Sequence, residues 1–77
     1  MPILDNKDYQ IAFGKWIKEA REDRSLLQSE MAGWLKIRQS YYSMIENGQR
    51  NVDLVLAIQI CDILGLSIDD FSKRYME

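Results

Sequence analysis

Apolar residues recur along the chain at helical spacing. Near its start, Ala12, Phe13, Trp16, Ile17 and Ala20 follow one another at short helical steps, with charged residues between them. This pattern predicts an amphipathic helix over about 9–24. The same reading predicts further helices over 28–35, 39–45 and 54–64, and a last one from 68 to about 75.

Capping and turn residues stand between these segments. Asn47 and Gly48 both tolerate positive φ, so they predict a stop after the third helix. Asp53 and Ser67 are suited to cap the fourth and fifth helices, and Gly65 predicts the end of the fourth. With no strand, repeat or linker in the pattern, we expect one all-α, five-helix domain over residues 1–77.

Composition narrows the function classes. A chain of 77 residues can bury only a marginal core, so tight helix packing or oligomerisation is expected to stabilise it. It has no histidine and one cysteine, which argues against a structural zinc site and an internal disulfide. The N-terminal residues lack the basic head and apolar run of a signal peptide, and no apolar stretch is long enough to cross a bilayer. We therefore expect a cytoplasmic protein with no membrane partner.

The middle of the chain has the dimensions of a helix-turn-helix, with two short helices joined by about three residues. In that motif the first helix braces the second, whose outer face enters the major groove of DNA. The candidate reading face consists of Gln39, Ser40, Ser43 and Met44, with Tyr41 beside them. Glutamine can pair with an adenine edge, serine with a base or a phosphate, and Met and Tyr can contact a thymine methyl. The alternative is a polar helix face exposed only to water.

The run "LLQSEMAGWLKIRQSYYSMIENGQRNVDLVLAIQICDILGLSIDDF" resembles the Cro/repressor-type, or Xre, helix-turn-helix family. The family pattern continues without a gap from 13 to 71. The shorter run around Tyr41 to Asn51 is also similar to controller proteins of restriction-modification systems. The resemblance implies a lambda-repressor-like five-helix fold with its motif at about 28–47. It also implies a sequence-specific regulator that binds a double-stranded DNA operator as a homodimer, with the 39–45 helix in the major groove.

Three features depart from the family pattern. Lys36 stands where a turn glycine is usual, so we expect it to adopt left-handed geometry at some cost. Leu27 and Arg38 replace the Ser or Thr that usually caps the two motif helices, and Tyr42 replaces a buried aliphatic residue.

The net charge of −2 does not indicate a nucleic-acid partner, so phosphate contacts must come from local features. By resemblance, Gln28 contacts a phosphate at the start of the bracing helix, and the Asn47 to Arg50 loop contacts the DNA backbone. Lys36, Arg38 and Arg50 flank the reading face, whereas the acidic residues that follow are expected to point away from it. Arg21 and Glu46 occupy positions that form a semi-buried salt bridge in related repressors.

The fourth helix carries more apolar surface than a monomer needs. On a helical wheel Leu54, Ala57, Ile60, Cys61 and Leu64 form the stripe for the core, and further apolar residues extend it on both sides. Such a surplus usually marks an interface. We predict a two-fold dimer with Leu56, Ile63 and Tyr75 at the contact and Val55 and Ile68 near it.

Other functions stay open at this point. A protein-interaction module that kept this fold and lost DNA binding would agree with the sequence pI of about 5.0. An antitoxin-type or phage-type regulator is a second alternative. An enzyme is disfavoured, because the sequence has no histidine, no Gly-rich phosphate loop and no convincing nucleophile–base pair. We expect no cofactor, no metal and no small-molecule ligand.

Overall fold

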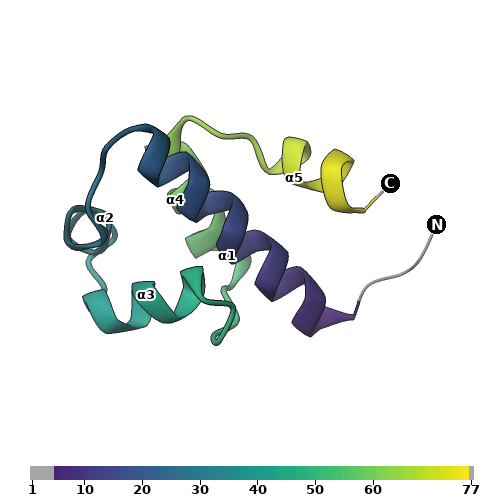
Figure 1. Ribbon diagram of the computed structural model, residues 1–77, viewed down its shortest axis with the longest axis horizontal. Coiled ribbons are helices and arrows are strands. Elements are labelled where there is room, and N and C mark those ends of the chain that lie inside the picture. Colours follow the sequence, from purple (N-terminus) through teal and green to yellow (C-terminus); the bar gives the residue numbers. More distant parts are fainter. Residues whose placement is uncertain (1–4, 77) are drawn as a thin grey trace.

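The computed structural model describes residues 5–76 and folds them into five helices (Figure 1). The helices are α1 (Asn6–Asp23), α2 (Gln28–Leu35), α3 (Gln39–Glu46), α4 (Leu54–Leu64) and α5 (Ile68–Tyr75). No strand occurs among residues 5–76. The predicted all-α, five-helix fold is therefore confirmed, and four of the five helices begin at the expected residue.

The first helix begins earlier than its apolar pattern predicted. The carboxylate of Asp5 accepts the backbone N–H of Asp8 at 2.9 Å, and the Asp8 carboxylate accepts the N–H of Asp5 at 3.4 Å. These reciprocal bonds form a capping box, which supports one more helical turn than the apolar residues require. The prediction missed this turn because it carries mostly polar side chains.

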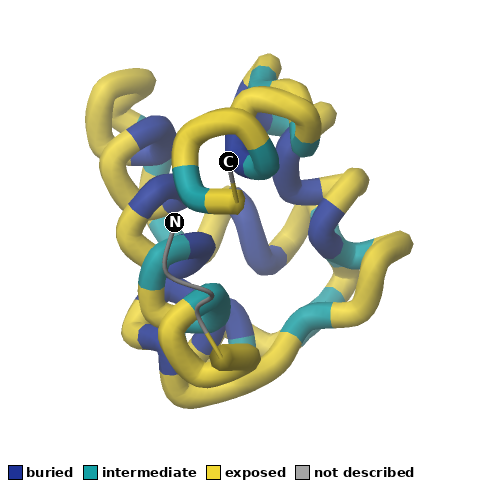
Figure 2. The backbone as a smooth tube through the Cα atoms, turned by 90° about the vertical axis from the view of Figure 1, so that its right-hand side faces the viewer, coloured by how far each residue is buried: buried dark blue, intermediate teal, exposed yellow. Residues whose placement is uncertain are grey.

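The core lies where α1 crosses the other helices. α1 packs against α3, α4 and α5, and α2 packs against α3 and α4. The largest fully buried side chains are Tyr42, Ile17, Met31, Ile45, Ile60 and Leu64. The rings of Phe13, Trp16 and Phe71 join α1 to α5, with centroids 5.3 to 6.0 Å apart. Figure 2 shows the buried stretches of each helix facing this common interior.

One predicted core residue lies on the surface. Leu54 was expected in the core stripe of the fourth helix, but it is 68 % exposed, whereas Ala57, Ile60, Cys61 and Leu64 are buried. Leu54 is the first residue of α4. Side chains in a helix point toward its N-terminus, so a residue in the first position projects past the helix instead of onto its neighbours. The core stripe of α4 therefore begins one turn later than the wheel indicated.

Two glycines allow the end of α3 to lie close against α1. A Cβ atom on Gly14 would clash with the backbone carbonyl oxygens of Ile45 and Glu46. Gly48 has φ +73°, and a Cβ atom there would come within 2.9 Å of the Ile11 Cα. The N-terminal half of α1 thus determines where α3 ends and where the following loop starts. No helix within residues 5–76 is both long and apolar enough to cross a membrane.

Candidate nucleic-acid interface

The outer face of α3 presents polar side chains to solvent. Tyr42 and Ile45 are buried against the core, while Gln39, Ser40 and Met44 are exposed. Ser43 is partly buried, and Tyr41 is partly buried with its side chain packed against the core. The structure therefore brings Gln39, Ser40, Ser43 and Met44 to one accessible surface and turns Tyr41 toward its edge.

The turn between α2 and α3 is held in a left-handed conformation by Lys36. Its backbone has φ 58° and ψ 41°, as its place in the motif predicted. The N–H of the next residue, Ile37, donates to the carbonyl of Ala32 at 3.1 Å, which closes the end of α2. Lys36 and Arg38 are both exposed and lie close in sequence to the start of α3. They are the cations nearest to that start along the chain.

The two motif helices begin without a side-chain cap. Leu27 and Arg38 hold the N-cap positions of α2 and α3, and neither accepts a hydrogen bond through its side chain. At α2 the Glu30 carboxylate accepts the N–H of Leu27 at 2.9 Å, which is half of a capping box. Within residues 5–76, the N–H groups of the first turn of α2 and of α3 consequently have no side-chain acceptor. Such groups, at the positive end of a helix dipole, can bind an anion.

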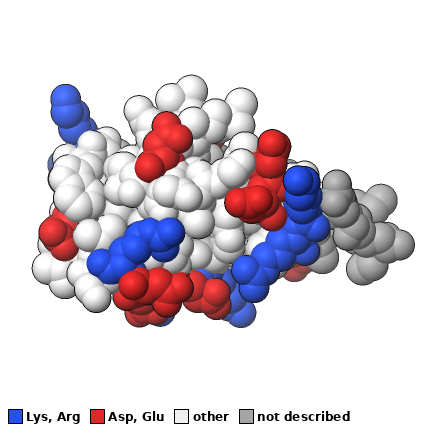
Figure 3. All heavy atoms as spheres, turned by 90° about the horizontal axis from the view of Figure 1, so that it is seen from above, with Lys and Arg blue, Asp and Glu red and all other residues white. Residues whose placement is uncertain are grey.

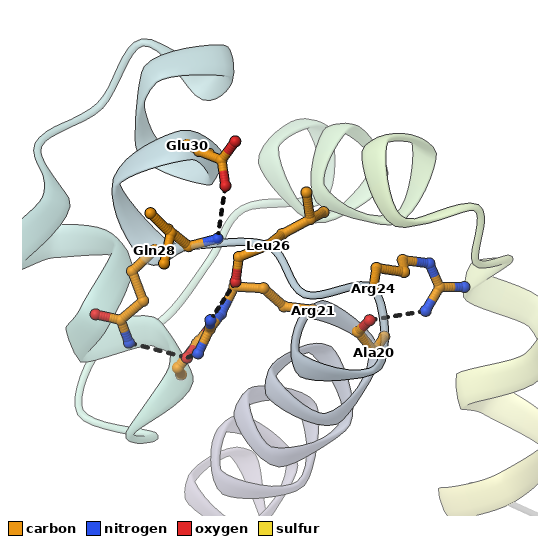
Figure 4. A network of polar contacts seen from close by, with 8 residues as sticks. Ala20, Arg21, Arg24, Leu26, Gln28 and Glu30 are labelled. Atoms are coloured by element: carbon orange, nitrogen blue, oxygen red, sulfur yellow. Dashed lines mark hydrogen bonds and ion pairs between the residues drawn. The ribbon is translucent and has the colours of Figure 1, made fainter.

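A buried charge pair joins the end of α1 to the end of α3. The Arg21 guanidinium donates from Nε to Glu46 Oε2 at 2.6 Å and from Nη2 to Glu46 Oε1 at 3.0 Å. Its Nη1 donates to the carbonyl of Leu26 at 2.7 Å, in the connection to α2. Gln28 joins the group, because its Nε2 donates to Glu46 Oε1 at 3.0 Å. Figure 4 shows Arg21, Leu26 and Gln28 converging on this network.

The contacts of this network change the pKa values of Glu46, Arg21 and Tyr42. Burial alone would raise the pKa of Glu46, but the hydrogen bonds from Arg21 and Gln28 and the Arg21 charge outweigh burial, so this pKa is lowered. The hydrogen bond to Glu46 raises the pKa of Arg21 further. Burial, and then the Glu46 carboxylate, raise the pKa of Tyr42 far above its ordinary value. The pair is therefore charged and Tyr42 is neutral at neutral pH.

The loop that follows α3 is anchored at its start and exposed beyond it. Gly48 is buried, and its carbonyl oxygen lies 3.5 Å from Gln10 Nε2, a long hydrogen bond from α1. Asn47 and Arg50 are exposed. The predicted backbone-contacting residues of this loop thus lie on the surface next to the end of α3.

Charge is mixed on the opposite side of the molecule. Figure 3 looks from above Figure 1, the side away from α3, and shows acidic and basic side chains interleaved there. Asp53, Asp62, Asp69 and Asp70 are all exposed on α4, on α5 or at their starts, outside the motif. The reading face itself carries no carboxylate, because the only acidic residue of α3 is the buried Glu46.

The predicted dimer residues divide into two groups. Val55 is 67 % exposed, whereas Leu56, Ile63, Ile68 and Tyr75 are partly buried and pack against the core. Leu56 and Ile63 lie on one edge of α4. The exposed apolar residues lie on the opposite edge, which consists of Leu54, Val55 and the 41 % exposed Ile58.

Two features of this region escaped the sequence analysis. The first is a groove of about 310 Å³ between α1, α4 and α5, whose lining includes Leu54, Ile68 and Met76. The second is the bond from Gln28 to Glu46. The spacing of Gln28 and Glu46 along the chain carried no signal that their side chains would meet.

Comparison with known proteins agrees with this geometry. The profile of the helix-turn-helix family matches residues 17–71. Control protein C.MunI from Mycoplasma sp is 38 % identical over 64 residues, which cover 82 % of this chain and 86 % of that protein. The uncharacterized HTH-type transcriptional regulator YqaF from Bacillus subtilis (strain 168) is 37 % identical over 51 residues, covering 66 % and 67 %.

A solved structure shows the same likeness in three dimensions. The crystal structure of the restriction-modification controller protein C.AhdI from Aeromonas hydrophila superposes with a TM-score of 0.71 and 32 % sequence identity. The superposition covers 78 % of this chain and 89 % of that one. The family match, the two relatives and this superposition together show that the chain belongs to the Cro/repressor-type (Xre) helix-turn-helix family of DNA-binding transcriptional regulators.

Proposed function

We propose that the protein is a sequence-specific regulator that binds operator DNA as a homodimer, with α3 in the major groove. The observation that carries this proposal is the exposed, carboxylate-free outer face of α3 beside two uncapped helix starts. An α-helix presented in this way fits the major groove, and free backbone N–H groups suit the flanking phosphates.

The residues divide into two roles. Gln39 and Ser40, at the start of α3, read base edges together with Ser43 and Met44. Tyr41 lies at the edge of this face. The DNA backbone is held by Gln28, Lys36, Arg38, Asn47 and Arg50. Only three of these five residues are cationic, so affinity falls slowly as salt rises. Each phosphate neutralised contributes roughly 0.9 to the slope of the logarithm of the binding constant against the logarithm of the salt concentration.

The relatives suggest the biological setting. C.MunI is named a control protein, and C.AhdI is a restriction-modification controller protein. Their identity to this chain over most of its length supports a role as a controller of that type. YqaF, named only as a transcriptional regulator, supports the broader function.

Selection from a randomised DNA library tests the proposal. The wild-type protein should enrich one sequence class, and Gln39→Ala should then lower affinity for that class by about 1–3 kcal/mol and relax preference at one base pair. Arg50→Ala should weaken binding to all sequences alike and flatten the salt dependence. Loss of discrimination in Arg50→Ala but not in Gln39→Ala would reverse the two roles.

A protein-interaction module of the same fold is the alternative, and the net charge of −2 is the observation that favours it. The same selection separates the two functions. A module that has lost DNA binding enriches no sequence, even at low salt where binding to phosphates is strongest.

The dimer is proposed to form through α4 and α5. The exposed edge with Leu54, Val55 and Ile58 adjoins the groove that reaches Ile68 and Met76, and together they form the apolar surface a partner copy would cover. A two-fold dimer would set two α3 helices one turn of DNA apart. The other edge of α4, with Leu56 and Ile63, is more nearly satisfied within the monomer.

Sedimentation of two matched variants locates the contact. Ile58→Asp and Ile63→Asp place the same charge on opposite edges of α4. If the exposed edge is the interface, Ile58→Asp is monomeric at micromolar concentration, while Ile63→Asp stays dimeric with a lower melting temperature. The reverse result would favour the contact at Leu56, Ile63 and Tyr75, and a monomeric wild type would exclude both.

A further inference from the structure

Glu46 is the most completely buried charge in the described part of the chain. Its side chain is 0 % exposed and accepts three N–H groups, two from Arg21 and one from Gln28. Arg21 is needed for stability, because a lone buried carboxylate would be strongly unfavourable. The bond from Gln28 is not required in that sense, since the guanidinium already reaches both carboxylate oxygens.

This third bond determines which way the Gln28 amide faces. A carboxylate can only accept hydrogen bonds, so the amide must turn its nitrogen toward Glu46. The amide oxygen is then directed away from the network, as the labelled Gln28 in Figure 4 shows. Gln28 is only partly buried and stands at the first position of α2. Toward a phosphate there, it offers one remaining N–H and an oxygen that repels the anion.

We propose that Glu46 limits DNA affinity by holding the Gln28 amide in this orientation. Glu46 is thus a positioning residue that acts on the DNA backbone through Gln28. The proposal rests on the proposed function and adds to it a residue that never touches DNA. The Glu46 charge itself has little direct effect on DNA, because Arg21 neutralises it at 2.6 Å inside the protein.

The substitution Glu46→Gln separates orientation from folding. Arg21 donates to both carboxylate oxygens, and its Nη2 shares Oε1 with Gln28. When the new amide keeps its oxygen at the Oε2 position, where Arg21 Nε makes the shortest bond, its nitrogen occupies the Oε1 position and faces Gln28. Gln28 then reverses, with its oxygen inward and both N–H groups outward. A stronger phosphate contact follows, although the protein loses the buried ion pair and becomes less stable. A merely structural role for Glu46 would lower affinity instead.

The DNA affinities of four proteins test this proposal: the wild type, Glu46→Gln, Gln28→Leu and the double variant. The probe is the duplex that the wild-type protein enriches from a randomised library, with binding followed by fluorescence anisotropy well below each melting temperature. Glu46→Gln should raise affinity about tenfold when Gln28 is present, the size of a hydrogen bond to a charged group. In the Gln28→Leu background the same substitution makes the same change of charge but should raise affinity less than about threefold.

Two other results overturn the proposal. An equal gain in both backgrounds would mean that charge alone acts, and a loss of affinity in the Gln28 background would mean that the role is structural. Gln28→Leu alone provides a test that does not depend on Glu46→Gln folding. Because Gln28 is proposed to hold the backbone through its one remaining N–H, Gln28→Leu should lower affinity by about threefold, whereas a tenfold loss would show that the amide already makes a full contact. If the wild type enriches no duplex, the proposed function fails and this inference with it; enrichment without coupling overturns only the inference.

Discussion

The scaffold helices and the motif helices are held in place by different means. The scaffold helices α1, α4 and α5 each start at a residue whose side chain accepts a backbone N–H of the first turn, namely Asp5, Asp53 and Ser67. The motif helices α2 and α3 start at Leu27 and Arg38, which provide no such bond. The motif helices are also short, with eight residues each; among the scaffold helices α5 has eight residues, α4 has 11 and α1 has 18.

This difference shows where the stability of the motif comes from. Helices of that length are not stable alone in water, and a missing cap removes about 1 kcal/mol more. α2 and α3 are instead fixed by tertiary contacts, which include the buried Met31, Tyr42 and Ile45 and the Arg21–Glu46 pair. Their first-turn N–H groups are left available for an external anion. The motif helices therefore depend for their stability on contacts with the rest of the fold, to whose core they contribute Met31, Tyr42 and Ile45.

The largest expected effect comes from breaking the charge pair. Glu46→Ala leaves the Arg21 guanidinium largely buried without its partner, and such a loss costs about 3–5 kcal/mol of unfolding free energy. Urea denaturation followed by circular dichroism measures it. In a double-mutant cycle with Arg21→Ala the two losses should be far from additive. Additive losses would mean that the pair contributes little and that the motif is held by apolar packing alone.

The pair also predicts a pH dependence. The folded-state pKa of Glu46 is lowered relative to the unfolded chain, so its contribution is fully present above the unfolded pKa of about 4.3. It is lost as pH falls through the lower folded-state value. The difference in unfolding free energy between wild type and Glu46→Gln should therefore shrink in acid. It should remain constant from about pH 5 to about pH 8, where Glu46 does not titrate.

Changes to the helix caps give the next largest effect. Removing a cap from a scaffold helix should lower the unfolding free energy, and adding one to a motif helix should raise it. Asp53→Ala removes the bond that the carboxylate accepts from Leu56 N–H at 2.8 Å, at a cost of about 1 kcal/mol. Leu27→Ser adds a cap to α2 and should stabilise the protein by up to about 1 kcal/mol, since little apolar contact is lost at this exposed site. Thermal melting compares the two. A loss of stability in Leu27→Ser would mean that the start of α2 is not free.

Lys36 should show a conflict between stability and binding. Lys36→Gly relieves the left-handed backbone at φ 58° and should stabilise the protein by roughly 0.5–1 kcal/mol. The same change removes a cation beside the reading helix, so affinity should fall and the salt slope should drop by roughly 0.9. Lys36→Ala is the matched control, because it removes the charge and keeps the strained backbone. Equal stability of Lys36→Gly and Lys36→Ala would contradict the claim that the left-handed backbone at this position is strained.

Local signals predicted the fold well and the network poorly. The apolar spacing from Phe13 to Ala20 and the stop at Asn47 depend on neighbours in the chain, and the structure agrees with both. The polar first turn of α1 was missed because its capping box has no apolar signal, and Leu54 was misplaced because a wheel ignores where a helix begins.

Contacts between residues distant along the chain follow only from the folded structure. The resemblance pointed to Arg21 and Glu46, but only the fold shows that Gln28 donates to the same carboxylate. The reading face on α3 follows from helical periodicity, whereas the exposed edge of α4 depends on which side α1 and α5 cover. Single-sequence reasoning therefore identifies candidate residues and leaves their mutual orientation open.

The smallest expected effect tests how completely the motif's polar core is satisfied. Tyr42 is fully buried on α3, yet its hydroxyl has no hydrogen-bond partner among residues 5–76. Burying a hydroxyl without a partner is unfavourable, so Tyr42→Phe should leave stability unchanged or raise it by up to about 1 kcal/mol. Tyr42→Leu, which restores the aliphatic type usual in the family, should instead lose packing around the ring. Urea denaturation of both variants decides the matter. A loss of more than about 1 kcal/mol in Tyr42→Phe would show that the hydroxyl does bond, through Glu46 or a buried water, and that the charge pair is part of a larger network.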